Sequence, residues 1–406
     1  MGQTPRTPRA VAGGKLPAGV VALGLVSLFM DMSSEMIHAL LPLYLTGTLG
    51  ASALAVGLIE GVGEATAQIT KLFSGYFSDR MGRRKPLAVV GYGLSALTKP
   101  LFALAGSPGL ILAARVADRV GKGIRGAPRD ALVADLVPPE QRGAAYGLRQ
   151  SMDTVGAFAG PLLAVLFMVV LNGNVPMIFA LAIIPAAIAV AILVLFVREP
   201  ARHSATKTPV RIDLASLKLL GPGVWTAVAI GSVMTLARIS EAFLILRADE
   251  VGLPMTYAPF VLVAMNVVYA GTSWPAGILS DRIGKSGLLA CGFAVLVLAD
   301  LCLGFGQGLW VMFAGVGLWG LHMGLTQGLL AAMVADATPA ALRGTAFGLF
   351  NLATGLALLI GNGVAGAVWV GFGSVATFGL GAALAVLALL AALLWHRDPP
   401  RPKPAR

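Results

Sequence analysis

The chain has 406 residues, of which 57% are hydrophobic and only 12% are charged. Soluble domains carry about 25% charged residues, so a chain of this composition is expected to fold in a lipid bilayer. The net charge of +11 does not indicate nucleic-acid binding, because most Lys and Arg residues lie in short loops between apolar segments. The two cysteines, Cys291 and Cys302, share one apolar segment and predict neither a disulfide framework nor a metal site.

Twelve segments are long and apolar enough to span a membrane, which takes about 20 residues. They lie at approximately 18–46, 53–75, 86–106, 109–132, 144–171, 175–197, 222–247, 255–278, 287–305, 308–334, 345–369 and 373–395. The first is too long for the apolar part of a signal peptide and is expected to be retained. We therefore predict an all-α integral membrane protein with two six-helix bundles, 18–197 and 222–395. A tail (1–17), a linker (198–221) and a second tail (396–406) surround the bundles.

The basic residues indicate the orientation in the membrane. Lys and Arg gather before the first span and in every second loop, at 6–15, 80–85, 142, 198–218, 282–285, 343 and 397–406. The loops on the opposite side are short and nearly uncharged, apart from 247–250. Because positive charge is retained on the cytoplasmic side, both termini should be cytoplasmic. The abundance of Ala, Gly and Arg is typical of a GC-rich bacterium, so we expect the bacterial cytoplasmic (inner) membrane.

The sequence repeats itself at the same place in each half. The segment GYFSDRMG at 75–82 recurs 202 residues later as GILSDRIG at 277–284. A second pair, VAD at 133–135 and RG at 142–143, recurs 201 residues later as VAD at 334–336 and RG at 343–344. Two related six-span halves are the simplest explanation.

The segment GYFSDRMGRRK at 75–85 resembles the signature of the major facilitator superfamily, which lies between spans two and three. Its second copy departs from the signature at Ser286, where another basic residue is common. The resemblance implies alternating access, in which two bundles rock around a central site, and a cytoplasmic gate. The implied gate residues are Gly75, Asp79, Arg80, Gly82, Arg83, Gly277, Asp281, Arg282 and Gly284. For the basic residues 83–85, plain positive-inside topology is the alternative.

A second motif of the superfamily is partly present in span five. Gly156-x-x-x-Gly160-Pro161 resembles the start of the antiporter motif, but Ala164 and Val165 stand where later glycines occur. Small residues four apart also let membrane helices approach closely, so helix packing is the alternative interpretation.

Span four carries an unusual number of charges. Arg115 precedes Asp135 by 20 residues, as in the superfamily's span-four motif, with Asp118 and Arg119 in place of the usual Gln and Gly. Further along, GIRGAPRD at 123–130 corresponds to the apolar GLTQGLLA at 324–331. If the fold alone required these charges, both copies should carry them. We infer that the charges of the N-terminal half serve coupling or substrate binding.

Acidic residues inside the membrane are suited to proton coupling. A carboxyl group in an apolar cavity has a raised pKa, and a nearby Arg or Lys lowers that pKa again, so opening and closing the cavity changes its protonation. The candidate proton-coupling residues are Asp31, Glu35, Glu60, Glu64 and Asp118. The alternative is a static salt-bridge network that holds spans one, two and four together.

The basic stripe on span four favours an anionic or zwitterionic substrate, because Arg binds carboxylates and phosphates well. The acids of this half nearly balance the bases, so a neutral or cationic substrate is the alternative. The candidate substrate-binding residues are Lys99, Arg115, Lys122, Arg125, Arg149, Arg238, Glu241, His322 and Gln327. For His322, a satisfied core histidine is the alternative.

The predicted function is secondary active transport by alternating access, as proton-coupled export of a small organic compound. One alternative is proton-coupled uptake or exchange of an organic or phosphorylated anion, and a remote one is a non-transporting receptor or scaffold. The sequence has no nucleophile elbow, zinc-protease motif or P-loop, which argues against an enzyme or an ATP-driven pump. We expect no cofactor and the proton gradient as energy source. The expected partners are substrate, protons and lipid, without nucleic acid, and the expected functional unit is a monomer.

Overall fold

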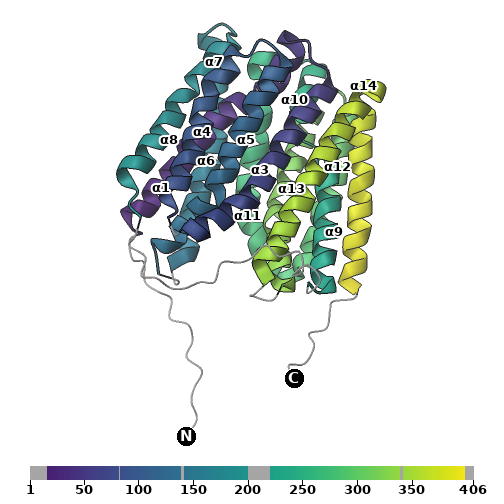
Figure 1. The fold of residues 1–406 in the computed structure, drawn as a ribbon. Helices are drawn as coiled ribbons and strands as arrows, with labels where there is room; N and C mark the ends of the chain where they lie inside the picture. Colours follow the sequence, from purple (N-terminus) through teal and green to yellow (C-terminus); the bar gives the residue numbers. More distant parts are fainter. Residues whose placement is uncertain (1–15, 82, 139–140, 200–219, 339–341, 398–406) are drawn as a thin grey trace.

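The computed structural model describes residues 16–81, 83–138, 141–199, 220–338 and 342–397, and within these ranges the chain is almost entirely helical (Figure 1). The N-terminal half contains α1 (Ala18–His38), α2 (Leu41–Leu43), the π-helical turn η1 (Tyr44–Thr48), α3 (Ala53–Met81), α4 (Lys85–Leu104), α5 (Pro108–Asp135), α6 (Arg142–Val170), α7 (Val175–Leu181) and α8 (Ile183–Phe196). The C-terminal half contains α9 (Pro222–Ala237), α10 (Glu241–Glu250), the 3₁₀ turn η4 (Met255–Tyr257), α11 (Phe260–Ile283), α12 (Lys285–Phe305), α13 (Gly308–Ala337) and α14 (Arg343–Arg397).

Most of these helices have the length and composition of membrane spans. Within the described ranges, nine helical stretches are long and apolar enough to cross a bilayer. The helices α3 and α5 are as long, at 29 and 28 residues, but they carry more polar and charged side chains. The long α14 is one of the nine stretches. Gly373 interrupts its helical backbone with φ 83°, close to the predicted boundary between the last two spans. The fold is thus all-α and membrane-embedded, and the count of twelve spans stays a prediction, as does the cytoplasmic position of both termini.

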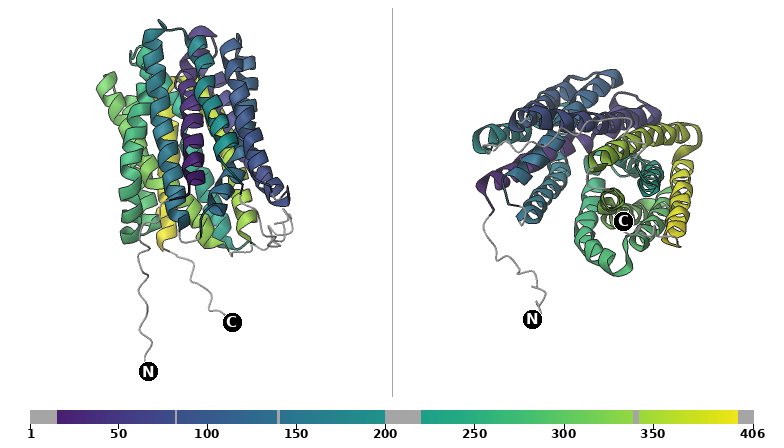
Figure 2. Two further views of the ribbon diagram at one scale, coloured as in Figure 1. Left: turned by 90° about the vertical axis from the view of Figure 1, so that its left-hand side faces the viewer. Right: turned by 60° about the horizontal axis from the view of Figure 1, so that its bottom comes forward.

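The helices of each half pack mainly on one another. In the N-terminal half α1 contacts α6 and α8, and α5 contacts α3 and α4, while in the C-terminal half α14 contacts α9 and α12, and α13 contacts α11 and α12. The two groups stand side by side in Figure 2, and they touch chiefly along α3 with α14 and α6 with α11. The linker predicted at 198–221 lies mostly outside the described residues, and the domain boundaries stay predictions.

The apolar core is continuous at one end of the molecule and divided at the other. One cluster combines residues of both halves, such as Met36 and Phe243, and lies where α1 ends and α3 begins. The remaining clusters each belong to one half, with Val20 in an N-terminal cluster and Phe293 and Val224 in C-terminal ones. The apolar core therefore joins the halves at the upper end of Figure 1, whereas toward the lower end each half has its own clusters. On one side α3 and α14 stay in contact there, with Leu72 against Gly348.

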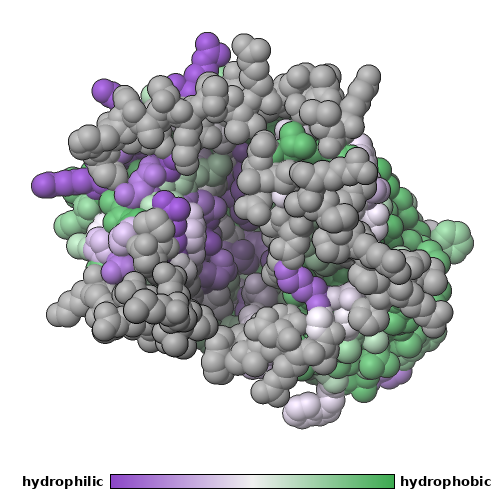
Figure 3. All heavy atoms as spheres, turned by 90° about the horizontal axis from the view of Figure 1, so that it is seen from below, coloured by the Kyte–Doolittle hydropathy of each residue, from purple (hydrophilic) through white to green (hydrophobic). Residues whose placement is uncertain are grey.

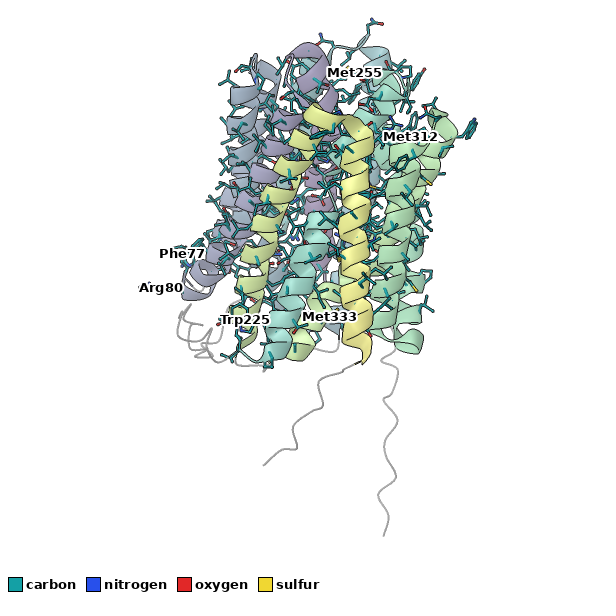
Figure 4. All side chains as sticks on the ribbon, turned by 90° about the vertical axis from the view of Figure 1, so that its right-hand side faces the viewer. Phe77, Arg80, Trp225, Met255, Met312 and Met333 are labelled. Carbon is teal, nitrogen blue, oxygen red and sulfur yellow. The ribbon has the colours of Figure 1, made fainter. Side chains whose placement is uncertain are left out.

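Side chains at the two ends can be followed in Figure 4. Arg80 and Phe77 lie at the lower end of α3, with Trp225 and Met333 at the same end of the molecule, whereas Met255 lies at the upper end. The lower end is thus where α3 finishes and the basic loops begin, which is the side predicted to be cytoplasmic.

Large apolar side chains cover the outside of the bundles. Trp310 is 91% exposed, and Leu104 and Phe372 are each 79% exposed. A soluble monomer rarely exposes contiguous apolar surface on this scale, so these side chains are expected to face lipid.

Candidate functional site

A cavity of about 370 Å³ lies between the two halves. All of its charged lining side chains come from the N-terminal half, whereas α11 and α13 contribute only neutral polar ones. The lining side chains are Asp31, Glu35, Glu64, Gln68, Lys71, Lys122, Arg125, Arg129, Gln150, Asp153, Thr154, Asn266, Tyr269 and Gln327, with Ala67, Gly123, Gly126 and Ala157 between them. Seen from the lower end, this region is a hydrophilic hollow between the two sides of the molecule (Figure 3).

Two carboxylates on α1 reach the cavity without a charged partner. Asp31 and Glu35 are four residues apart, so they lie on one face of the helix. Among the described residues, no Lys, Arg or His nitrogen lies within 4 Å of either carboxylate. By contrast, Glu64 on α3 is paired with Arg119 at 3.2 Å. Asp31 and Glu35 are therefore the acids most available to a proton or a cation entering the cavity.

Close packing between α1 and α6 places Glu35 in the cavity. Gly156 and Gly160 of α6 lie against α1, and a Cβ atom at Gly160 would stand 2.7 Å from both the Cβ atom of Glu35 and the carbonyl oxygen of Met32. At Gly156 the backbone carbonyl oxygen of Leu28 would be closer still to the added atom. The glycine pair predicted as a helix-packing motif thus lets α6 lie directly on the acidic helix.

The basic side chains of α5 alternate with glycines that bring this helix close to its neighbours. Gly121 faces Ser95 on α4, and Gly123 faces Thr70 on α3, with no room for a larger side chain at either position. Arg125 extends between α5 and α4, where it donates to the Ser95 hydroxyl at 2.7 Å and lies 4.7 Å from the centre of the Tyr92 ring. Its guanidinium is thereby held at the cavity wall.

Lys122 and Lys71 have no carboxylate within 4 Å among the residues described here. Both line the same cavity as Asp31 and Glu35. Arg125, which is held at the cavity wall, also has no carboxylate within 4 Å in this part of the chain. The cavity therefore offers two acids from α1 and three bases from α3 and α5 that lack a partner of opposite charge. Such a lining can hold a cation, an anion or a molecule that carries both charges.

A buried network closes the upper end of the cavity. Arg115 lies 2.5 Å from Glu60 and donates to Nδ1 of His38 at 3.2 Å. Because Nδ1 accepts this hydrogen bond, Nε2 of a neutral His38 carries the proton. That nitrogen lies 3.7 Å from the carboxylate of Glu241 on α10, so His38 and Glu241 bring a titratable pair together across the two halves.

The structure distributes the predicted site residues over several environments. Asp31, Glu35, Glu64, Lys122, Arg125 and Gln327 line the cavity, and Glu60, Arg115 and Glu241 belong to the network that closes it. Lys99 and Asp118 form a buried pair at 3.0 Å, and Arg149 pairs with Asp153. In each of these two pairs the partner balances the charge. The roles predicted for these residues in transport stay predictions.

Two predicted residues of the C-terminal half do not line the cavity. His322 is fully buried, and its Nδ1 atom is 2.8 Å from the carbonyl oxygen of Gly292. Its Nε2 atom is buried without a hydrogen-bond partner among the described residues, so only one of the two ring nitrogens is satisfied. Arg238 stands at the break between α9 and α10. Sequence reasoning missed Asn266 and Tyr269, although their spacing of three residues in an otherwise apolar span indicates a shared polar face.

The gate signature is described in part. Gly75 lies in α3 next to Ala127 of α5, and Arg80 and Arg83 are exposed at the lower end. Gly284 separates α11 from α12 with φ 77°. Gly82 lies outside the described residues, as do the side chains of Asp79, Asp281 and Arg282, and Gly277 is placed only as part of the α11 backbone. The gating role of the signature stays a prediction.

The chain resembles known transporters over nearly its whole length. A sequence profile of the Major Facilitator Superfamily matches residues 23–265 and 226–406. An uncharacterised MFS-type transporter of Methanocaldococcus jannaschii is 33% identical over 367 residues, covering 87% of this chain and 89% of that protein. The multidrug resistance protein MdtH of Sodalis glossinidius is 25% identical over 359 residues, covering 86% of each.

Solved structures show the same fold. A bacterial homologue of the human lysosomal transporter Spinster, in an inward-facing and unoccupied conformation, superposes with a TM-score of 0.76 at 17% identity, covering 97% of this chain and all of that one. The profile match and the archaeal relative identify the family, whose members are transporters and not enzymes. The protein is a multi-pass membrane protein and belongs to the major facilitator superfamily.

Proposed function

We propose that this protein exports a small organic compound in exchange for protons, as a monomer in the bacterial cytoplasmic membrane. The observation that carries the proposal is the pair of unpaired carboxylates, Asp31 and Glu35, in a cavity that is hollowed toward the predicted cytoplasmic side. An exporter must accept its substrate from that side. The name of the MdtH relative, a multidrug resistance protein, favours export over uptake.

Competition for these carboxylates would couple the two fluxes. A cationic or zwitterionic compound bound at Asp31 and Glu35 stabilises their ionised form, and so disfavours a proton at the same place. When the halves close over the cavity, an acid without substrate loses water and is neutralised by a proton instead. Each conformational change then carries either the compound or protons, which is antiport.

A second candidate is uptake or exchange of an organic or phosphorylated anion. Lys71 and Lys122 favour it, because both reach the cavity and neither has a carboxylate partner within 4 Å in the described part of the chain. In that case the substrate anion supplies the missing counter-charge. The acids of α1 would then repel the substrate until they are protonated.

Liposomes that contain the purified protein and a trapped pH dye separate these candidates. We would test cationic, zwitterionic and anionic compounds with the wild type, Glu35→Gln, Lys122→Gln and a matched control, Asp249→Asn, which neutralises an exposed carboxylate. Substrate-dependent proton movement is expected in the wild type and the control, and is expected to fall to the level of empty liposomes in Glu35→Gln.

The other outcomes each have a distinct meaning. Flux of anions that depends on Lys122 and tolerates Glu35→Gln would favour the second candidate. Substrate flux without proton movement would exclude coupling. An absence of flux for every compound class would favour the receptor or scaffold alternative.

A further inference from the structure

The C-terminal bundle contains a buried acid that the cavity does not use. Asp300 lies on α12 and is 1% exposed. Both of its carboxylate oxygens lack a hydrogen-bond partner. An ionised carboxylate in such a place is very costly, so the group is expected to be neutral or to hold a cation.

A break in the neighbouring span supplies an oxygen atom without a donor. The helix α9 ends at Ala237 and α10 begins at Glu241, so the Ala237 carbonyl loses its regular partner four residues ahead. Among the described residues no donor forms a hydrogen bond to that carbonyl. Instead, the amide of Ser240 donates to the side chain of Asn362 at 2.7 Å, which stabilises the break.

Gly381 of α14 brings the carboxylate and the carbonyl together. A Cβ atom at Gly381 would stand 2.8 Å from Oδ2 of Asp300 and 3.5 Å from the carbonyl oxygen of Ala237. The absence of a side chain at this glycine leaves both oxygen atoms around one small space. Two acceptor atoms, Oδ2 of Asp300 and the carbonyl oxygen of Ala237, thus border one space with no donor between them.

No charged group in the described surroundings neutralises Asp300, and none lies within 4 Å of it. On the described part of the chain, α12 itself carries the ionisable side chains Lys285, Cys291 and Cys302, α13 carries His322 and α11 carries Tyr269. Around the break and along α10 lie Arg238, Glu241, Arg247, Asp249 and Glu250, and α14 has no described ionisable side chain near Gly381. Arg247 is already bound to the carbonyl oxygens of Leu303 and Gly306 and to Glu250. The side chains of Asp281 and Arg282 on α11 are not described.

We propose that Asp300 is a proton-binding site in the C-terminal bundle, and that its acid form donates to the Ala237 carbonyl and stabilises the break between α9 and α10. A single proton turns Asp300 into a neutral group and supplies the missing donor. The break also positions Glu241, which contacts His38 across the halves. Protonation of Asp300 therefore favours the conformation in which the upper end is closed.

Infrared spectroscopy of the full-length protein in lipid tests this site without any transport assay. We expect the carbonyl stretch of a protonated carboxylic acid at neutral pH in the wild type and in the control Asp249→Asn, and the loss of that band in Asp300→Asn. A band that persists unchanged in Asp300→Asn would overturn the proposal. A wild type without the band, but with a thermal shift specific to Na⁺ over K⁺, would overturn it in favour of a cation site.

Two substitutions distinguish a side chain at position 300 that donates a hydrogen bond from one that only fills space. Asn supplies an N–H donor where the protonated acid supplies O–H, so Asp300→Asn should keep the wild-type unfolding temperature, whereas Asp300→Ala should lower it. Equal losses in both variants would contradict the donor role. This test is independent of the proposed export function. Glu35→Gln tests proton-coupled flux in a protein whose Asp300 is unchanged, so either proposal can fail without the other.

Discussion

The contact between Gly160 and α1 gives a quantitative prediction for Gly160→Ala. The added Cβ atom would lie 2.7 Å from the Met32 carbonyl oxygen and from the Glu35 Cβ atom, whereas ordinary contacts begin at 3.4 Å. The helices α1 and α6 must therefore move apart by about 0.7 Å to relieve the overlap. Overpacking of this kind costs about 1–3 kcal/mol, partly offset by a helix-propensity gain of about 1 kcal/mol.

The same displacement affects the site, because Glu35 lies on the shifted helix. We expect Gly160→Ala to lower the unfolding temperature in detergent and to reduce substrate-dependent proton movement. The matched control is Gly147→Ala on the same helix, where nothing lies within 4 Å of the added atom. There the propensity gain acts alone, so stability should stay equal or increase. If Gly160→Ala behaves like Gly147→Ala in both assays, the proposed helix contact does not position Glu35.

Two further predictions concern buried polar contacts. Arg115→Met leaves Glu60 buried without its partner and should destabilise the protein by about 3–5 kcal/mol. The double variant Glu60→Met with Arg115→Met should recover much of this loss of stability. If the losses of the two single variants simply add in thermal unfolding, the pairing is contradicted. Asn362→Ala removes the acceptor of the Ser240 amide and should cost about 1–3 kcal/mol. An unchanged unfolding temperature for Asn362→Ala would mean that the break is stabilised elsewhere.

The sequence alone indicated the fold class and the uneven distribution of intramembrane charges between the two halves. Apolar segments of span length and the repeated signature are local properties of the chain, so they are visible without coordinates. The concentration of charges in the N-terminal half, including Asp31, Glu35 and Lys122, is equally local. The structure then brings these three side chains into one cavity.

Only the tertiary structure decided which charges are paired. Glu60 and Glu64 are four residues apart on α3, and helical spacing treats them alike. Packing against α5 places Glu60 beside Arg115 in the closing network, whereas Glu64 pairs with Arg119 and still lines the cavity.

The contacts around the broken span could not be foreseen either. Spacing along one helix defines a face, but the rotation and separation of neighbouring helices determine what that face meets. The pairing of His38 with Glu241, and the meeting of Asp300 with the Ala237 carbonyl at Gly381, join segments more than 60 residues apart. Such contacts arise from the packing of the bundles, which leaves no periodic trace in the sequence.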